Sequence, residues 1–336
     1  MYKKVVGLCF SPLGDALFTT PAIRALRFNL PEAQIVILAN QLGVEVFKRN
    51  PYQIEVVNCL DQWDLLKKTV EIRKSGFDLA LGLSQIGSFF TRFCSTPFRS
   101  DFFSISEKNS LSVVKLCLEV LIQAGLAVNT YETEFWLSES ERDTVGLFLK
   151  KAGCDGGKPI IAVHCGGHYF ARKRWPLQNF IRLIEAIIEE SSYQVMLVGG
   201  KEDVEDAAII DSIIPEVINT VGRFSLGETA ALLRRCKLLI ANDSGPLHLG
   251  AAIGIPTVGL FGPTTPEQFY PYRQPLHRCI YKKLSCSPCY RFGGGLWQYL
   301  PRCSKAYCME AIEVSEVLGL IMDKVSTGMN AIVEVT

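Results

Sequence analysis

The sequence predicts an α/β protein with two open, doubly wound parallel sheets. Short apolar runs alternate with helical segments, this alternation restarts in the second half of the chain, and 336 residues are enough for two hydrophobic cores. Strands that alternate with helices pair in parallel through right-handed crossovers. We therefore expect two α/β domains, with the first over residues 1–155 and the second over 156–312.

The first half begins with a strand at residues 5–10, a turn at 11–15 and a helix at 16–29. Further predicted strands lie at 35–39, 54–57 and 77–83, and further helices at 42–49, 63–74 and 111–124. Residues 138–158 are polar and end in a Gly-Gly-Lys-Pro sequence. This region is the predicted linker between the domains.

The second half repeats the pattern with strands at 160–164, 194–200, 238–240 and 256–261. Helices are expected at 177–190, where Pro176 suits the first turn, and after a Ser-x-x-Glu capping box at residues 225–228. A closing amphipathic helix is predicted at 314–325.

The strand at 238–240 leads through Asp243 and Ser244 into a helix of small residues. Unpaired N–H groups and the dipole at a helix N-terminus favour an anion such as phosphate. Gly245 allows a ligand to approach the backbone, and His248 lies four residues after Ser244, on the same helix face. The alternative is an ordinary capped helix with a buried histidine.

Composition excludes several classes of function. A net charge of +1 with 21% charged residues shows no overall bias toward nucleic acid. The first apolar run is too short for a signal peptide or a membrane span, so we expect a cytoplasmic protein with free cysteines.

The sequence has no P-loop, no Gly-x-Gly-x-x-Gly after the first strand and no Gly-x-Ser-x-Gly elbow.

Other polar residues follow predicted strands and are expected at the same sheet edges. Asp15 follows the first strand and is a candidate general base or a helix cap. Basic residues at 172–174 and the acids Glu202 and Glu205 suit the phosphates and ribose of a nucleoside diphosphate. An aromatic segment at 89–99 carries Arg92 and suits an anionic acceptor, a membrane surface or simply a core.

Four motifs in order resemble glycosyltransferase family 9, the ADP-heptose:lipopolysaccharide heptosyltransferases. They are residues 11–21 (SPLGDALFTTP), 173–176 (KRWP), 243–248 (DSGPLH) and 261–264 (FGPT). The resemblance implies a GT-B fold, with two Rossmann-like domains facing a central cleft. It implies that the first domain binds the acceptor and the second the nucleotide sugar, and that the final segment, 313–336, packs back toward the first domain.

The resemblance also implies roles for individual residues. Asp15 matches the catalytic base and Lys173 the lysine at the donor diphosphate. The remaining matches to donor-binding positions are Phe224 near the adenine, and Asp243, Ser244, Gly245 and His248 in the phosphate loop. Glu202 and Glu205 are alternatives for the ribose, while Thr19 and Arg92 are the predicted acceptor contacts.

The implied reaction is an inverting transfer of heptose from ADP-heptose to a lipid-linked lipopolysaccharide core, with no metal required for catalysis. It would take place at the cytoplasmic face of the inner membrane of a Gram-negative bacterium, with peripheral membrane contact. Alternatives are another nucleotide sugar, a protein acceptor, or a non-catalytic nucleotide-sugar-binding homologue.

Four cysteines are grouped near the end of the chain, within the loop 286–308. The group consists of Cys286, Cys289, Cys303 and Cys308. Their spacing, Cys-x2-Cys and then Cys-x4-Cys, is close to that of a four-thiolate metal site. The alternatives are a structural Zn or Fe ion and a set of reduced thiols.

Overall fold

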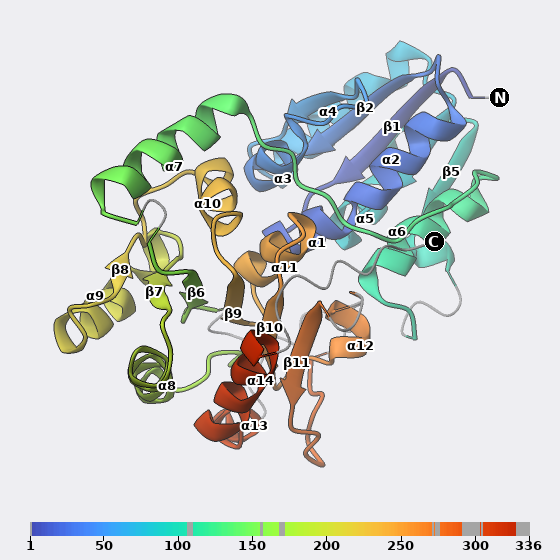
Figure 1. The fold of residues 1–336 in the computed structure, drawn as a ribbon. Helices are drawn as coiled ribbons and strands as arrows, with labels where there is room; N and C mark the ends of the chain where they lie inside the picture. The colour runs from blue at the N-terminus through green and yellow to red at the C-terminus, as the bar shows by residue number, and fades with distance from the viewer. Residues whose placement is uncertain are drawn as a thin grey trace. The chain divides into compact units, whose positions relative to one another are not determined.

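The computed structural model describes residues 2–105, 110–154, 157–167, 172–270, 272, 276–290, 303 and 305–326. The chain divides into two compact units (Figure 1). The first comprises Met1–Trp136 with Glu267–Pro271, and the second Leu137–Pro266 with Tyr272–Thr336. No helix of the described residues is long and apolar enough to cross a membrane.

The first unit contains a parallel sheet in the order β3-β2-β1-β4-β5. Its strands are β1 (Lys4–Cys9), β2 (Gln34–Ala39), β3 (Glu55–Asn58), β4 (Leu79–Gly82) and β5 (Phe98–Asp101). Its helices are α1 (Leu13–Phe18), α2 (Thr20–Asn29), α3 (Gln41–Phe47), α4 (Gln62–Ile72), α5 (Gln85–Phe90) and α6 (Val113–Gln123). The described part of this unit also has short 3-10 turns at Arg73–Ser75, Thr91–Phe93 and Phe102–Ser104.

Helix α12 (Pro266–Phe269) falls at a boundary between the two units. The central strands of the first sheet, β1, β2 and β4, are buried on both faces, as expected for parallel strands between helices. Alternate residues of β1, Val6 and Leu8, pack with Leu65 of α4 and Phe90 of α5 in one core cluster. The central strands are therefore held by apolar packing, and their carboxyl ends carry the polar loops.

The second unit contains a parallel sheet in the order β11-β10-β9-β6-β7-β8. Its strands are β6 (Ile160–His164), β7 (Gln194–Leu197), β8 (Ile218–Asn219), β9 (Leu238–Asn242), β10 (Thr257–Phe261) and β11 (His277–Tyr281). Its helices are α7 (Glu139–Lys151), α8 (Leu177–Glu190), α9 (Val204–Ile213), α10 (Leu226–Leu233), α11 (Gly245–Ala252), α13 (Tyr307–Glu310) and α14 (Val314–Ser326), with a 3-10 turn at Lys201–Asp203.

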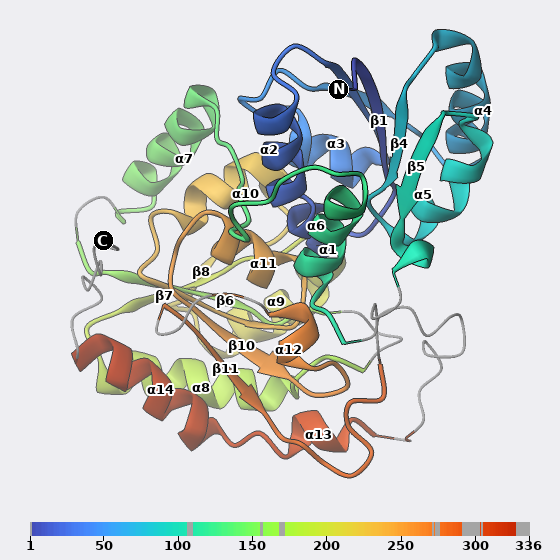
Figure 2. The same cartoon turned by 90° about the vertical axis from the view of Figure 1, so that its right-hand side faces the viewer.

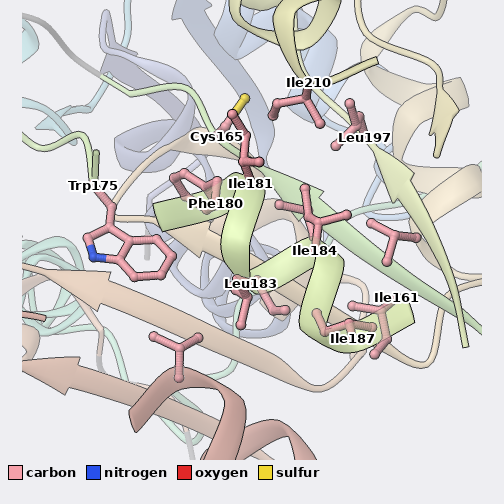
Figure 3. Close-up of a cluster of buried hydrophobic side chains, with 14 of the residues drawn as sticks. Ile161, Cys165, Trp175, Phe180, Ile181, Leu183, Ile184, Ile187, Leu197 and Ile210 are labelled. Carbon is pink, nitrogen blue, oxygen red and sulfur yellow. The ribbon is translucent and has the colours of Figure 1, made fainter. Parts of the chain in front are cut away.

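Helices α8 and α14 lie side by side along one face of the second sheet (Figure 2). Between them and the strands is a hydrophobic core that includes Phe180, Ile184 and Leu197 (Figure 3). Phe180 and Trp175 are both buried, and their rings meet edge to face with centroids 5.0 Å apart. This packing holds the start of α8 against the sheet, next to the basic segment that precedes it.

Two features of the second unit differ from the sequence-based expectation. The polar region expected to be a linker contains α7, because Ser138 and Glu141 form a capping box and Val145 and Leu149 are buried one turn apart. The units accordingly divide at Leu137 rather than at residue 155. The closing segment 313–336 was expected to pack toward the first domain; in its described part, Val317 and Ile321 of α14 belong to the core of the second unit, and residues 327–336 lie outside the described residues.

Replacing Phe180 with alanine is expected to lower the free energy of unfolding by roughly 3–5 kcal/mol, because a fully buried ring leaves a cavity. Chemical denaturation monitored by circular dichroism measures this change. Leu147→Ala on α7 is the control, since that side chain is 63% exposed and its loss should cost no more than about 0.5 kcal/mol. Equal effects of the two substitutions would contradict the assigned core.

Candidate active site

The polar loops of the second unit meet where the strand order of its sheet reverses. The chain runs from β6 outward to β8, then returns to β9 on the other side of β6. Ligands of open α/β sheets bind at the carboxyl ends of the strands that flank such a point. Here these ends are His164 of β6 and the Asp243-Ser244 pair that follows β9.

Asp243 is the centre of a buried polar group. Lys173 Nζ and Thr264 Oγ1 each donate to its Oδ2 atom at 2.7 Å, and His248 Nε2 lies 3.1 Å from Oδ1. Burial alone would raise the pKa of this carboxyl, but the charges and hydrogen bonds of Lys173 and His248 hold it well below its usual range. Asp243 is therefore an ionised carboxylate that orients a lysine, a histidine and a threonine.

Lys173 is held from a second direction by an aromatic ring. Its ammonium lies 5.2 Å from the ring centroid of Tyr290, which is close enough for a cation–π contact. Tyr290 is placed there because the backbone N–H groups of Cys289 and Tyr290 both donate to the Pro263 carbonyl. Sequence reasoning missed Tyr290, since no pattern links the cysteine-rich segment to the basic motif.

His248 lies in α11 and is almost fully buried. Its Nδ1 atom is 3.1 Å from the Tyr272 hydroxyl, so the imidazole bridges Tyr272 and Asp243. The sequence suggested that this side chain faces a ligand, or alternatively that it is a buried histidine. The structure supports the buried alternative for His248, with polar partners on both ring nitrogens.

Ser244 is the N-cap residue of α11, and Gly245 is the first residue of that helix. Both are only partly buried. The Ser244 hydroxyl makes no capping bond to the helix; it donates to the Asn242 carbonyl and contacts His164 Nδ1. The alternative of an ordinary capped helix is therefore wrong for this helix start.

In the acidic loop after β7, the structure does not single out either of the two acids that were predicted to bind the ribose. Glu202 and Glu205 are exposed, and neither is singled out as a ribose ligand by its surroundings. The buried acid of this loop is Asp203, which contacts His164, and sequence reasoning did not select it. Phe224, expected near an adenine, is half-buried and packs edge to face on Phe148 of α7.

In the first unit, the strand order reverses between β1 and β4. Asp15 lies in the first turn of α1, directly after β1, and is partly buried. Thr19 was expected to contact an acceptor, but it is fully buried and its hydroxyl donates to the Asp15 carbonyl, so the structure does not offer it to a ligand. Arg92 is exposed, with its guanidinium 5.7 Å from the ring centroid of Phe103.

The four cysteines of the predicted metal site are free thiols with different exposures. Burial, together with nearby Cys289 and Cys303, raises the pKa of Cys308 to about 11. Within the described ranges, which include all four, no group of three or more His, Cys, Asp or Glu side chains is arranged to hold a metal ion. A bound metal at these cysteines stays a prediction.

Comparisons with known proteins agree with this fold. A lipooligosaccharide heptosyltransferase 2 of Campylobacter jejuni is 24% identical over 285 residues, or 82% of this chain and 86% of the relative. A family 9 glycosyltransferase structure from Veillonella parvula has a TM-score of 0.81 at 22% identity, covering 97% of this chain and 98% of the other. The structure of Escherichia coli ADP-heptose lps heptosyltransferase II has a TM-score of 0.74 at 20% identity, with coverages of 96% and 99%.

These structural similarities confirm the predicted α/β class of the GT-B type, with two Rossmann-like units. The model of glycosyltransferase family 9 (heptosyltransferase) matches residues 101–294, which is more than half of the chain. The match includes three of the four motifs that predicted the family, from the basic segment to the turn after β10. The chain therefore belongs to glycosyltransferase family 9, the heptosyltransferases.

Proposed function

We propose that this protein transfers heptose from ADP-heptose to the inner core of a lipopolysaccharide or lipooligosaccharide. One observation carries the proposal beyond family membership: the Lys173 ammonium is held by Asp243 beside the N-terminus of α11, at the switch point of the second sheet. A lysine and a helix N-terminus together suit the diphosphate of a nucleotide sugar.

In this proposal the second unit binds the donor and stabilises the leaving ADP. Lys173 and Ser244, with the backbone at Gly245, contact the diphosphate, and their charge and dipoles compensate the negative charge that develops as the glycosidic bond breaks. This arrangement assigns no catalytic role to a metal ion. Glu202 and Glu205 remain alternative ligands of the ribose, and Phe224 is the proposed neighbour of the adenine.

The first unit supplies the base and the acceptor contacts. The Asp15 carboxylate accepts the proton of the attacking acceptor hydroxyl, and a single displacement then inverts the anomeric carbon. Arg92 is the proposed contact for an anionic acceptor, with the exposed Phe89 and Phe98 in the same part of the chain. Because the acceptor is lipid-linked, we place the reaction at the cytoplasmic face of the inner membrane.

A direct test incubates the protein with a panel of nucleotide sugars and truncated core acceptors, and identifies each product by mass spectrometry. Transfer of one heptose from ADP-heptose is the expected result. Transfer from a different nucleotide sugar, or to a protein, would replace the proposed substrates. ADP binding without any transfer would indicate a non-catalytic homologue.

Replacing Lys173 with alanine is expected to raise KM for the donor and to lower kcat by roughly 10²-fold, because one charged contact to the leaving group is lost. Initial-rate kinetics with ADP-heptose measure both parameters. The control is Lys282→Ala, which removes a lysine of the same unit that pairs with Glu316 at the surface. Unchanged kinetics of the Lys173 variant would remove this residue from the donor site.

We also propose that the four grouped cysteines bind a structural Zn or Fe ion. Elemental analysis of the purified protein is expected to find about one equivalent per chain, and a Cys286→Ser, Cys289→Ser variant should lose it. Less than about a tenth of an equivalent in the unmodified protein would count against the site. No catalytic step depends on this ion.

A further inference from the structure

Ser244 has the backbone of a capping serine but does not cap its helix. Ser84, the N-cap of α5, has φ −150° and ψ 167°, and its hydroxyl accepts a hydrogen bond from the Gly87 N–H at 3.0 Å. Ser244 has nearly the same backbone angles, φ −151° and ψ 168°, without any such bond. The backbone therefore does not explain the difference, and the cause lies in what the Ser244 side chain contacts.

The Ser244 hydroxyl lies between two groups outside the helix. It donates to the Asn242 carbonyl at 3.0 Å, and it lies 3.1 Å from Nδ1 of His164. His164 is the last residue of β6 and is only 3% exposed. Because β6 and β9 are neighbours at the switch point, the pairing of the two strands brings this imidazole to the residue that begins α11.

The other side of the His164 ring is held by Asp203. Nε2 lies 3.2 Å from Asp203 Oδ2, and the Gly200 N–H donates to the same oxygen at 3.1 Å. Burial would raise the pKa of Asp203, but His164, the Gly200 N–H and Arg174 together bring it below its usual value. The carboxylate is ionised and accepts from Nε2, which orients the ring with Nδ1 toward Ser244.

The surrounding backbone restricts the positions that the His164 ring and the Asp203 carboxylate can take. A Cβ atom at Gly166 would collide with the Asp203 carboxylate and would lie 2.8 Å from His164 Nε2. Asn242 Nδ2 donates to the carbonyls of Cys165 at 3.1 Å and of Gly166 at 2.7 Å, which ties the loop after β6 to the end of β9. The imidazole is thus enclosed by the loop and the carboxylate.

We propose that His164, oriented by Asp203, is a positioning residue that holds the Ser244 hydroxyl in the orientation used to bind the donor diphosphate. This inference rests on the proposed function, because it assigns Ser244 to the same anion site. If the hydroxyl turned to the capping position, it would occupy an N–H group of α11 and would no longer point away from the helix. With Nε2–H bound to Asp203, Nδ1 is an acceptor, so the Ser244 hydroxyl hydrogen is shared between Nδ1 and the Asn242 carbonyl. Rotation to the capping position would give up the contact with Nδ1.

Two substitutions separate positioning from a merely structural role. In His164→Asn the side-chain amide takes the place of Nδ1 and keeps a polar group next to Ser244, whereas in His164→Gln it reaches the place of Nε2 and keeps the partner of Asp203. We expect the Gln variant to bind ADP about tenfold more weakly, the effect of one lost hydrogen bond, and the Asn variant to bind within about threefold of the unmodified protein. A purely structural role predicts the opposite order.

A double-substitution cycle provides a second readout by titration calorimetry with ADP. Ser244→Ala should weaken binding about tenfold, and adding His164→Gln should weaken it little further, because both changes remove one and the same interaction. If the Gln variant does not fold, as judged by circular dichroism, Asp203→Ala replaces it in the cycle, since this change removes the acceptor of the His164 Nε2–H. Additive losses would overturn the positioning role.

The unmodified protein distinguishes the failure of this inference from that of the proposed function. The positioning role alone is wrong if the unmodified protein binds ADP but the Asn variant binds it more weakly than the Gln variant. The same holds if the losses of affinity from Ser244→Ala and His164→Gln are additive. If the unmodified protein binds no ADP at concentrations that saturate other nucleotide-dependent enzymes, the proposed donor site is wrong and the positioning role falls with it. Weaker ADP binding by the Gln variant than by the Asn variant supports both the proposed donor site and the positioning role of His164.

Discussion

Replacing Asp15 with asparagine is expected to abolish sugar transfer while ADP binding stays near its unmodified level. Asparagine has the size of aspartate but cannot accept the proton of an acceptor hydroxyl, and loss of a general base typically costs 10²–10⁴-fold in rate, by order of magnitude. Asp15 lies in the first turn of α1 in the first unit, whereas the proposed ADP contacts all come from the second unit. The Asp15→Asn substitution should therefore affect heptose transfer without affecting ADP binding.

The measurement pairs a transfer assay with a calorimetric titration of ADP. Asp64→Asn is the matched control, because Asp64 also lies in the first turn of a helix of the first unit, where it pairs with Lys68. That variant should transfer heptose at the unmodified rate. Near-normal turnover of the Asp15 variant would exclude this residue as the base, and lost ADP binding would show that its effect is not confined to proton transfer.

Replacing Asp243 with asparagine is expected to abolish donor binding and to destabilise the second unit. The neutral amide leaves Lys173 without a counter-charge in a buried position, and breaking a buried ion pair costs roughly 3–5 kcal/mol. One of the two carboxylate oxygens also becomes an NH2 donor, so either His248 or the pair Lys173 and Thr264 loses its acceptor. Chemical denaturation and ADP titration measure the two effects.

The lowered pKa of Asp243 gives this prediction a pH dependence. A carboxyl whose pKa is depressed by folding contributes stability above its unfolded pKa of about 3.9, and this contribution is lost as the pH falls toward the folded value. The difference in unfolding free energy between the unmodified protein and the variant should therefore be largest near pH 7 and shrink below about pH 4. Asp211→Asn, at an exposed position of α9, is the control and should change stability by no more than about 0.5 kcal/mol at either pH. A pH-independent difference would contradict an ionised Asp243.

Much of the fold was accessible from the pattern of apolar residues. The runs that became β1, β2, β6, β9 and β10 are buried on both faces, and such strands appear in a sequence as short continuous apolar segments. The capping box at Ser225 and Glu228 was predicted from spacing alone and is confirmed. Shorter or more polar elements were missed, including β8, β11 and α9, because packing against neighbouring elements rather than local pattern determines them.

The candidate site shows a similar division. The sequence marked Lys173, Asp243 and His248, since each lies in a motif next to a predicted strand or helix. It did not identify Tyr290 or Asp203. Tyr290 follows a cysteine-rich segment and reaches Lys173 only because its backbone binds the turn after β10. Asp203 lies between Glu202 and Glu205 in the chain, and nothing in the local sequence distinguishes it from these two acids.

The sequence by itself determined the α/β class, the family and the residues that the motifs contribute, because apolar periodicity and motif spacing are local properties of the chain. Only the tertiary structure decided which of these residues touch. Strand order brings β6 beside β9 although more than 70 residues separate His164 from Ser244. Burial and its partners then determined the ionisation of Asp243: Lys173 and Thr264 reach it from two separate loops and His248 from helix α11, and no sequence pattern predicts these contacts.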